Sequence, residues 1–346
     1  MKLIRDKSHK VKPNNLLSNY IEKYDICGKA TITQKELHKF QGVFFIIIPD
    51  NYESIQMSPL VPLATCSSIT KLSQDTRMST IRNSEIVSDS TTAMALEASL
   101  RRKKFMYEKE KMYSVVDLFT FHRILRLQKF DKRKGFLQHF EILGMLSSGR
   151  AYGKNSFINK KIFEHIKIWI FFIKSLNQNG YSFKNIKFTF SDICLIETIM
   201  EKYNVPREVI NKNSLNDKYD YFKEYCINLP TTINNIDEIK HFFDDDSKQI
   251  LYNKIKSFEY NVINILRLEF PEVKFEYELD RKLGLGYFSS FCYHGFAVND
   301  LNEFIPLIDG GVVNWLGQLL SDNREMAVTS SFGVELAMNK FRINNC

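Results

Sequence analysis

Two arginines that could bind phosphate oxygens stand three residues apart in the stretch 119–150. Arg123 and Arg126 precede a basic turn at 129–135, and a second apolar run follows His139. A guanidinium is planar and permanently charged, so it suits the oxygens of a phosphate. Two apolar runs around a polar turn with glycine predict a β-hairpin with a long loop. An ordinary hairpin with a solvated basic tip fits the same residues.

A second polar group occupies 89–91, where a strand-like segment passes into a helical one. Asp89 and Thr91 would stand at a strand-to-helix junction, where polar side chains can hold the amine of a ligand. Asp89 or Ser90 is also a good N-cap for a helix over 92–104. On local sequence, the simpler interpretation is that Asp89 only caps this helix.

Other candidate residues carry weaker signals. His122 should point to the opposite face of its strand from Arg123 because side chains alternate, so we expect a histidine of the core or sheet surface. His294 and Cys292 have an i, i+2 spacing without a third group to support nucleophilic catalysis. The six cysteines show no CxxC and no paired Cys/His spacing, which argues against a zinc site. The acidic run 244–246 is expected at a helix N-terminus or solvated turn.

The elements that must position these residues can be predicted from the pattern. Thr33 and Glu36 fit a capping box, so a helix should begin there and run to about Phe40. The apolar run 43–48, which ends at Pro49, predicts a buried strand. Further helices are expected at 160–176, 192–203 and 334–340, and further strands at 186–190, 273–278, 286–296, 305–309 and 327–332.

Composition places the chain among globular proteins. Its 346 residues are 44% hydrophobic and 25% charged, with no visible secretory signal and no apolar run long enough to span a bilayer. A reduced, cytoplasmic setting is the default for scattered cysteines. The formal charge of +8 favours anionic partners, but the lysines come with abundant Asn and Ile, which is typical of a genome-wide bias.

The expected organisation has four parts. Residues 1–40 form a basic arm and the first helix, 41–180 the first part of a core, 181–270 a mostly helical insertion or subdomain, and 271–346 the second part of the core. The role of 205–257 is open.

Four segments together resemble the catalytic core of class II aminoacyl-tRNA synthetases, nearest the branch of histidyl-tRNA synthetase and the regulatory subunit of ATP phosphoribosyltransferase. The segment 85–91 is similar to the one that binds the amino group of the amino acid. The segment 123–140 is similar to the second class motif, and 283–290 to the histidine pocket. Gly310-Gly311, followed by 331–336, resembles the last glycine-rich strand and third motif. The resemblance covers roughly 40–176 and 270–342.

The resemblance implies an α+β fold with a central antiparallel sheet flanked by helices, and a homodimer built through the first motif. It implies ATP with Mg²⁺, and a small carboxylate or amino-acid substrate activated as an acyl-adenylate. Positioning and charge neutralisation are what such a reaction requires. Carried over by position, Arg123 is the catalytic arginine. The cofactor-binding residues are Arg123, Arg126, His139, Phe140 and Glu335, and the substrate-binding residues are Asp89, Thr91, Tyr287 and Ser289.

Three positions depart from the family pattern. Leu125 replaces the usual glutamate of the second motif, Leu336 the arginine of the third motif, and Leu283 the arginine of the histidine pocket. Histidine activation is therefore not expected, although Arg126, Arg150 or Arg281 could substitute for a lost arginine.

Three functions stay open. The first is an acid-activating enzyme that passes an acyl-adenylate to a non-standard acceptor, such as a nucleic acid or carrier. The second is a catalytically silent regulatory or small-ligand-binding protein, which the three leucines favour. The third is a nucleic-acid-binding protein, which rests on charge alone.

Overall fold

The computed structural model describes residues 2–70, 73–128, 137–151, 156–214, 216 and 218–343. The basic turn predicted at 129–135 and Cys346 lie outside the described residues.

Within these ranges one mixed sheet of nine strands forms the centre of the protein. Its six middle strands are antiparallel to their neighbours, while β1 and β8 add to them in parallel. The α+β fold with a central antiparallel sheet is therefore confirmed. In sheet order the strands are β1 (Tyr52–Ser54), β4 (Val116–Leu125), β5 (His139–Arg150), β11 (Glu325–Phe332), β10 (Phe304–Val313), β9 (Phe291–Val298), β6 (Lys184–Asp192), β8 (Lys274–Glu278) and β7 (Thr232–Ile233).

Helices surround this sheet, and a small second sheet pairs β2 (Leu60–Pro62) with β3 (Ser84–Ile86). The larger α-helices are α4 (Gln34–Ile47), α6 (Ser90–Tyr107), α7 (Ser156–Asn177), α8 (Ile193–Lys202) and α11 (Asp246–Phe258). The shorter ones are α1 (Lys2–Ser8), α2 (Pro13–Glu22), α3 (Tyr24–Cys27), α5 (Thr65–Thr70), α9 (Arg207–Asn213), α10 (Tyr221–Glu224), α12 (Asn264–Glu269), α13 (Trp315–Leu320) and α14 (Val334–Lys340). Helical turns η1 (Gln74–Thr76), η2 (Lys109–Lys111) and η4 (Ile236–Phe242) and the π-helix η5 (Glu259–Ile263) complete the described elements. None of the helices in the described ranges is both long and apolar enough to cross a membrane.

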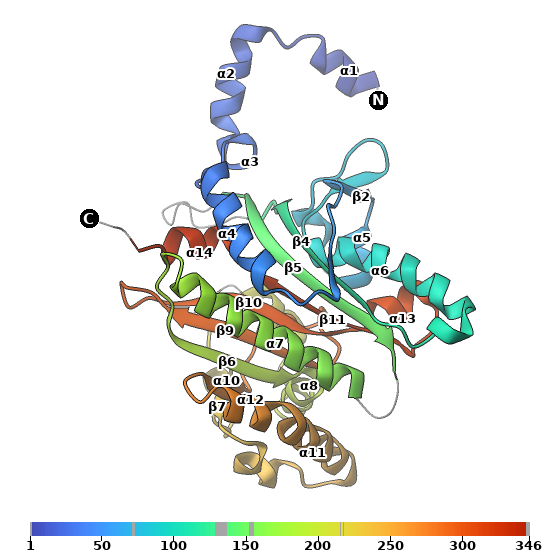
Figure 1. Cartoon of the computed structure of the whole chain (residues 1–346), viewed down its shortest axis with the longest axis vertical. Helices are drawn as coiled ribbons and strands as arrows, with labels where there is room; N and C mark the ends of the chain where they lie inside the picture. Colours follow the sequence, from blue (N-terminus) through green and yellow to red (C-terminus); the bar gives the residue numbers. More distant parts are fainter. Residues whose placement is uncertain are drawn as a thin grey trace.

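The two faces of the sheet carry different helices (Figure 1). On one face α4 and α7 lie over the middle strands, where Trp169 stacks on Phe332 and Phe44 packs edge-on against Phe119. The other face carries α6, and Ser90 lies so close to Gly144 of β5 that a Cβ there would stand 2.5 Å from the Ser90 hydroxyl. We call these the α7 face and the α6 face.

Residues 43–47 are helical and Ile48 is the C-cap of the same helix, so the predicted strand was wrong. The capping box of Thr33 and Glu36 starts α4 as expected, but the helix continues to Ile47 instead of ending near Phe40. Phe40 and Phe44 are buried on its inner side, at the spacing of a helix face. A short apolar run has no periodicity that separates a strand from a buried helix, and here the helix already under way continued through it.

The turn before β9 is longer than expected. Strand structure begins at Phe291, not near Gly286, because Gly284 and Gly286 adopt φ of 83° and 85°. These left-handed conformations favour glycine and break the extended backbone. Tyr287 and Ser289 consequently lie in this turn.

The N-terminal arm and the range 181–270 can now be compared with the organisation expected from the sequence. The arm consists of α1, α2 and α3; α1 and α2 extend away from the rest of the chain, whereas α3 lies next to α4 (Figure 1). No residue of α2 is buried. The range 181–270, predicted to be a mostly helical insertion, also contributes β6 and β7 to the large sheet. The acidic run 244–246 lies at the start of α11, where Asp245 is the N-cap, as expected.

Candidate functional site

The β4–β5 hairpin presents its side chains to both faces of the sheet. The two strands pair without a register shift, and Arg123 lies opposite Glu141. Phe121 is on the same side of β4 as Arg123 and contacts Phe44 of α4. Ile124 is on the other side and packs in a cluster with residues of α6. Because side chains alternate along a strand, Arg123 lies on the α7 face.

On that face the Arg123 guanidinium is held by three neighbours. Its Nη2 lies 3.0 Å from Oε2 of Glu335, its Nε lies 3.7 Å from Oε2 of Glu141, and its Nη1 bonds to Nδ1 of His139 at 2.9 Å. Burial and the nearby guanidinium both lower the pKa of His139, which favours a neutral ring that accepts this bond. Burial raises the pKa of Glu141 to about 7, although Arg123 opposes the rise.

Glu335 connects this arginine to the N-terminal segment. Its Oε1 accepts hydrogen bonds from the backbone N–H of Thr31 at 3.1 Å and from the Thr31 hydroxyl at 2.8 Å. Its Oε2 also accepts the backbone N–H of Glu141 at 3.0 Å. Nearby, the backbone N–H of Gln138 donates to the carbonyl of Asp25 at 2.9 Å. Both oxygens of Glu335 therefore tie the base of the hairpin to the chain that leads into α4.

A separate polar group lies at the N-terminus of α6. Asp89 caps this helix, and its Oδ1 accepts the backbone N–H of Thr91 at 2.9 Å and the Thr91 hydroxyl at 2.6 Å. The Tyr287 hydroxyl donates to Oδ2 of Asp89 at 2.8 Å and lies 2.8 Å from the Thr91 hydroxyl. Burial and the Asp89 charge raise the pKa of Tyr287. The structure thus brings together three of the residues predicted to bind substrate, from segments 198 positions apart.

Arg126 lies beside this group and not beside Arg123. Its Nε donates to the carbonyl of Ser88 at 2.8 Å, and its guanidinium lies 5.6 Å from the centre of the Phe140 ring. Ser88 directly precedes the Asp89 cap, so Arg126 and Phe140 border the Asp89 group. The fourth predicted substrate residue, Ser289, donates its hydroxyl to the carbonyl of Val312 at 3.3 Å and fastens the turn to β10.

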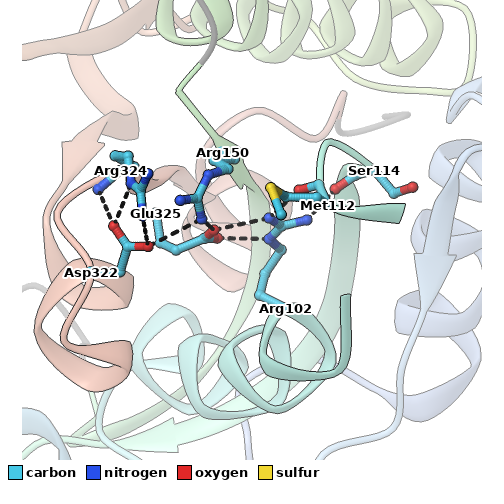
Figure 2. A network of polar contacts seen from close by, with 7 residues as sticks. All are labelled: Arg102, Met112, Ser114, Arg150, Asp322, Arg324 and Glu325. Carbon is cyan, nitrogen blue, oxygen red and sulfur yellow. Dashed lines mark hydrogen bonds and ion pairs between the residues drawn. The ribbon is translucent and has the colours of Figure 1, made fainter. Parts of the chain in front are cut away.

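Arg150 and Arg281, the other two arginines considered as substitutes, lie apart from the Asp89 group; Arg281 is described below. Arg150 ends β5 inside a buried ion-pair network, where its Nη1 contacts Glu325 at 3.0 Å and Asp322 at 3.1 Å (Figure 2). The same Glu325 accepts two hydrogen bonds from Arg102, which is completely buried. Arg150 therefore fastens β5 to β11.

Two of the leucines that depart from the family pattern differ in exposure: Leu125 is buried, while Leu283 is 42% exposed.

Sequence reasoning missed a row of five residues, four of them polar, that crosses the α6 face. Strand pairing sets five residues of neighbouring strands side by side, in the order Gly144, Ser331, Asp309, His294 and Thr189. The spacing of these residues along the chain gives no signal, because each belongs to a different strand. The row begins under the N-terminus of α6, where Ser90 covers Gly144.

Asp309 and His294 form the centre of a charged cluster in this row. Arg281 is fully buried, and its Nη2 donates to Oδ1 of Asp309 at 2.7 Å, while its Nη1 finds no acceptor in the described part of the chain. His294 bonds through Nδ1 to Oε2 of Glu278 at 3.2 Å, and the Thr189 hydroxyl donates to the same oxygen at 2.8 Å. Burial would raise the pKa of Glu278, but His294, Arg281 and Thr189 outweigh it and hold this pKa at about 2.

No group of three or more His, Cys, Asp or Glu side chains that could hold a metal ion occurs in the described ranges. The fold of the chain is similar to that of the class II aminoacyl-tRNA synthetase-like core, and the solved structures that share it include members of the histidyl-tRNA synthetase branch. No model of a known protein family matches the chain, and no curated protein matches it in sequence.

Several solved structures have a fold similar to that of this chain. An ATP phosphoribosyltransferase regulatory subunit/histidyl-tRNA synthetase from Bacillus halodurans superposes with a TM-score of 0.61 at 14% identity, over 90% of this chain and 81% of that chain. A histidine–tRNA ligase subunit from Alicyclobacillus acidocaldarius gives 0.63 at 10% identity, over 90% and 95%. A histidyl-tRNA synthetase from Nostoc gives 0.59 at 12% identity, over 88% and 70%. At these identities the likeness establishes the fold.

Proposed function

We propose that the protein is a small-ligand-binding relative of the histidyl-tRNA synthetase branch that recognises an amino compound on the α6 face, without activating it. The observation that carries this proposal is the Asp89, Thr91 and Tyr287 group. A buried carboxylate at a helix cap, supported by two hydroxyls, is arranged to accept hydrogen bonds from an ammonium group.

The position of Arg123 supports a site that binds its ligand without activating it. The resemblance assigns this arginine to the α-phosphate of ATP, but its guanidinium is engaged by Glu335, Glu141 and His139 on the α7 face. Leu336 replaces the arginine that usually meets the γ-phosphate. Without these two cations on the ligand face, the charge of a bound triphosphate and of its transition state would be poorly compensated.

The second candidate is the acid-activating enzyme that uses ATP and Mg²⁺ and transfers the acyl group to a nucleic acid or carrier. One observation favours it: Arg126 borders the Asp89 group and lies over the Phe140 ring. In this scheme Arg126 takes the role assigned to Arg123, and Phe140 stacks on the adenine. In the same scheme Glu335, which binds Arg123 and Thr31, and His139, which binds Arg123, take no part in nucleotide binding.

The two candidates are separated by titrating the protein with the standard amino acids, first alone and then with ATP and magnesium, and by measuring pyrophosphate exchange. We expect at least one amino acid to bind without nucleotide and no exchange with any of them. A Tyr287→Phe variant should bind that amino acid several-fold more weakly. Exchange that disappears in Arg126→Met would establish the enzyme instead, and no binding by any amino acid would overturn both candidates.

We also propose a homodimer in the cytoplasm. The outer side of α4 leaves Phe45 51% and Ile46 85% exposed, which suits a covered interface. The cysteines at 27, 66, 194, 226 and 292 are free thiols, as in a reducing compartment. Sedimentation at two protein concentrations tests the dimer, and Ile46→Glu should yield monomers.

A further inference from the structure

We propose that Asp309 and His294 form a second recognition site on the α6 face, specific for a cationic N–H group, an ammonium or a guanidinium, at the far end of the ligand. This inference deepens the proposed function and rests on it only for the placement of the ligand's own amino group near Asp89. It assigns the ligand to the basic amino acids.

The His294 ring is oriented from behind. Its Nδ1 faces Oε2 of Glu278 at 3.2 Å, and this carboxylate also accepts the Thr189 hydroxyl. A carboxylate acceptor at Nδ1 fixes the proton of a neutral imidazole on that nitrogen. In this tautomer Nε2, on the other side of the ring, carries a lone pair and no proton.

That lone pair faces another acceptor. Nε2 of His294 lies 3.6 Å from Oδ1 of Asp309, which is too long for a direct hydrogen bond. Two acceptors at this separation repel each other unless a donor lies between them or the ring takes a second proton. An N–H-bearing cation placed over the two atoms would satisfy both.

Asp309 is accessible to such a cation. Its side chain is 44% exposed although β10 lies in the middle of the sheet, and its Oδ2 accepts no hydrogen bond from the described part of the chain. Arg281, which is fully buried, fixes the carboxylate through Oδ1. Because Arg281 holds Oδ1, Oδ2 is the oxygen left for a donor on the ligand.

The distance across the sheet matches a long side chain. Gly144, which lies under the N-terminus of α6, is separated from Asp309 by two strand spacings, about 10 Å. A ligand whose α-amino group meets Asp89 must therefore carry its second nitrogen on a chain of several carbons. Lysine and arginine have this form, whereas short amino acids do not reach the row.

The test compares matched ligands by calorimetry without nucleotide: L-lysine and L-arginine against L-norleucine, which has lysine's carbon chain without its terminal nitrogen. We expect lysine or arginine to bind at least tenfold more tightly than norleucine. Asp309→Asn should remove this preference while it keeps an oxygen for Arg281. Asp300→Asn, at an exposed aspartate after β9 that pairs with Lys184, should leave the preference unchanged.

Two further results keep the test decisive. If Asp309→Asn melts early because Arg281 loses its counter-ion, His294→Gln carries the test, since it should also reduce the preference. Equal binding of lysine, arginine and norleucine by the wild type, no binding of any of them, or a preference that survives both variants overturns the inference. Pyrophosphate exchange with a neutral amino acid, without a preference for basic ones, would refute it independently of the adenylation question.

Discussion

Arg123 and Glu335, 212 residues apart, are joined by an ion pair of 3.0 Å on the α7 face of the sheet. Arg126, three residues further along the chain, lies on the α6 face beside the cap of α6. Two arginines of one hairpin thus serve different sides of the protein. The ion pair of Arg123 joins the hairpin, the N-terminal segment and α14, and it is separate from the group around Asp89.

The two arginines should therefore respond differently to substitution. Arg123→Met leaves the carboxylates of Glu141 and Glu335 without their cation, so we expect a loss of about 1–3 kcal/mol in the free energy of unfolding. Binding of an amino acid should stay within twofold of the wild type. Urea denaturation and calorimetry measure the two effects.

Arg126→Met is the matched variant. We expect it to weaken ligand binding several-fold, because the side chain that supports Ser88 and Phe140 is lost, with a smaller effect on stability. If Arg123→Met proves as stable as the wild type but no longer binds the ligand, the assignment of the two faces is wrong.

The N-terminal segment should loosen when its contact with Glu335 is weakened. Thr31→Val removes the hydroxyl that donates to Glu335 Oε1, which costs about 1 kcal/mol locally. We expect faster hydrogen exchange of the amides at 24–31. Thr33→Val serves as the control, since it removes the cap of α4 and should affect the first turn of that helix instead. Unchanged exchange at 24–31 in Thr31→Val would contradict the role of this contact.

Glu141 should make the protein less stable as the pH rises. Its pKa is about 7 in the folded protein, against an ordinary value of 4.5. Between these values the folded state keeps a proton that the unfolded chain has released, so stability falls across this window and levels off above pH 7, by about 3 kcal/mol at most. Glu141→Gln should remove that fall, as measured by urea denaturation at pH 5 and pH 8. Glu97→Gln should retain the wild-type pH dependence.

The ion-pair network of Figure 2 should be essential for stability. Glu325 is fully buried and accepts from both Arg102 and Arg150. Glu325→Gln leaves the buried Arg102 guanidinium without its counter-ion, while Arg150 keeps Asp322, and we expect a loss of about 3–5 kcal/mol in the free energy of unfolding. Glu269→Gln, which breaks an exposed pair with Lys167, should cost less than about 1 kcal/mol. Similar losses in the two variants would show that burial does not govern the strength of this network.

Local pattern determined most of the elements and the junction at Asp89. The capping box at Thr33, the hairpin at 116–150 and the helix from Ser90 follow from rules that act within a few residues, and so does the role of Asp89 as an N-cap. The same rules failed at 43–48, because an apolar run of six residues fits either a buried strand or a buried helix turn.

Only the tertiary structure decided which side chains meet. Alternation along β4 is enough to separate the sides of Arg123 and Arg126, but only the packing of the helices decided that the side of Arg126 carries α6 and Asp89. The row from Gly144 to Thr189 is assembled by pairing between five strands, so its charges come together only when the register of every pair is set. The sequence by itself determined the elements and the cap; the strand order and register brought Asp309, His294 and Arg281 together, because those contacts join distant segments that no local pattern relates.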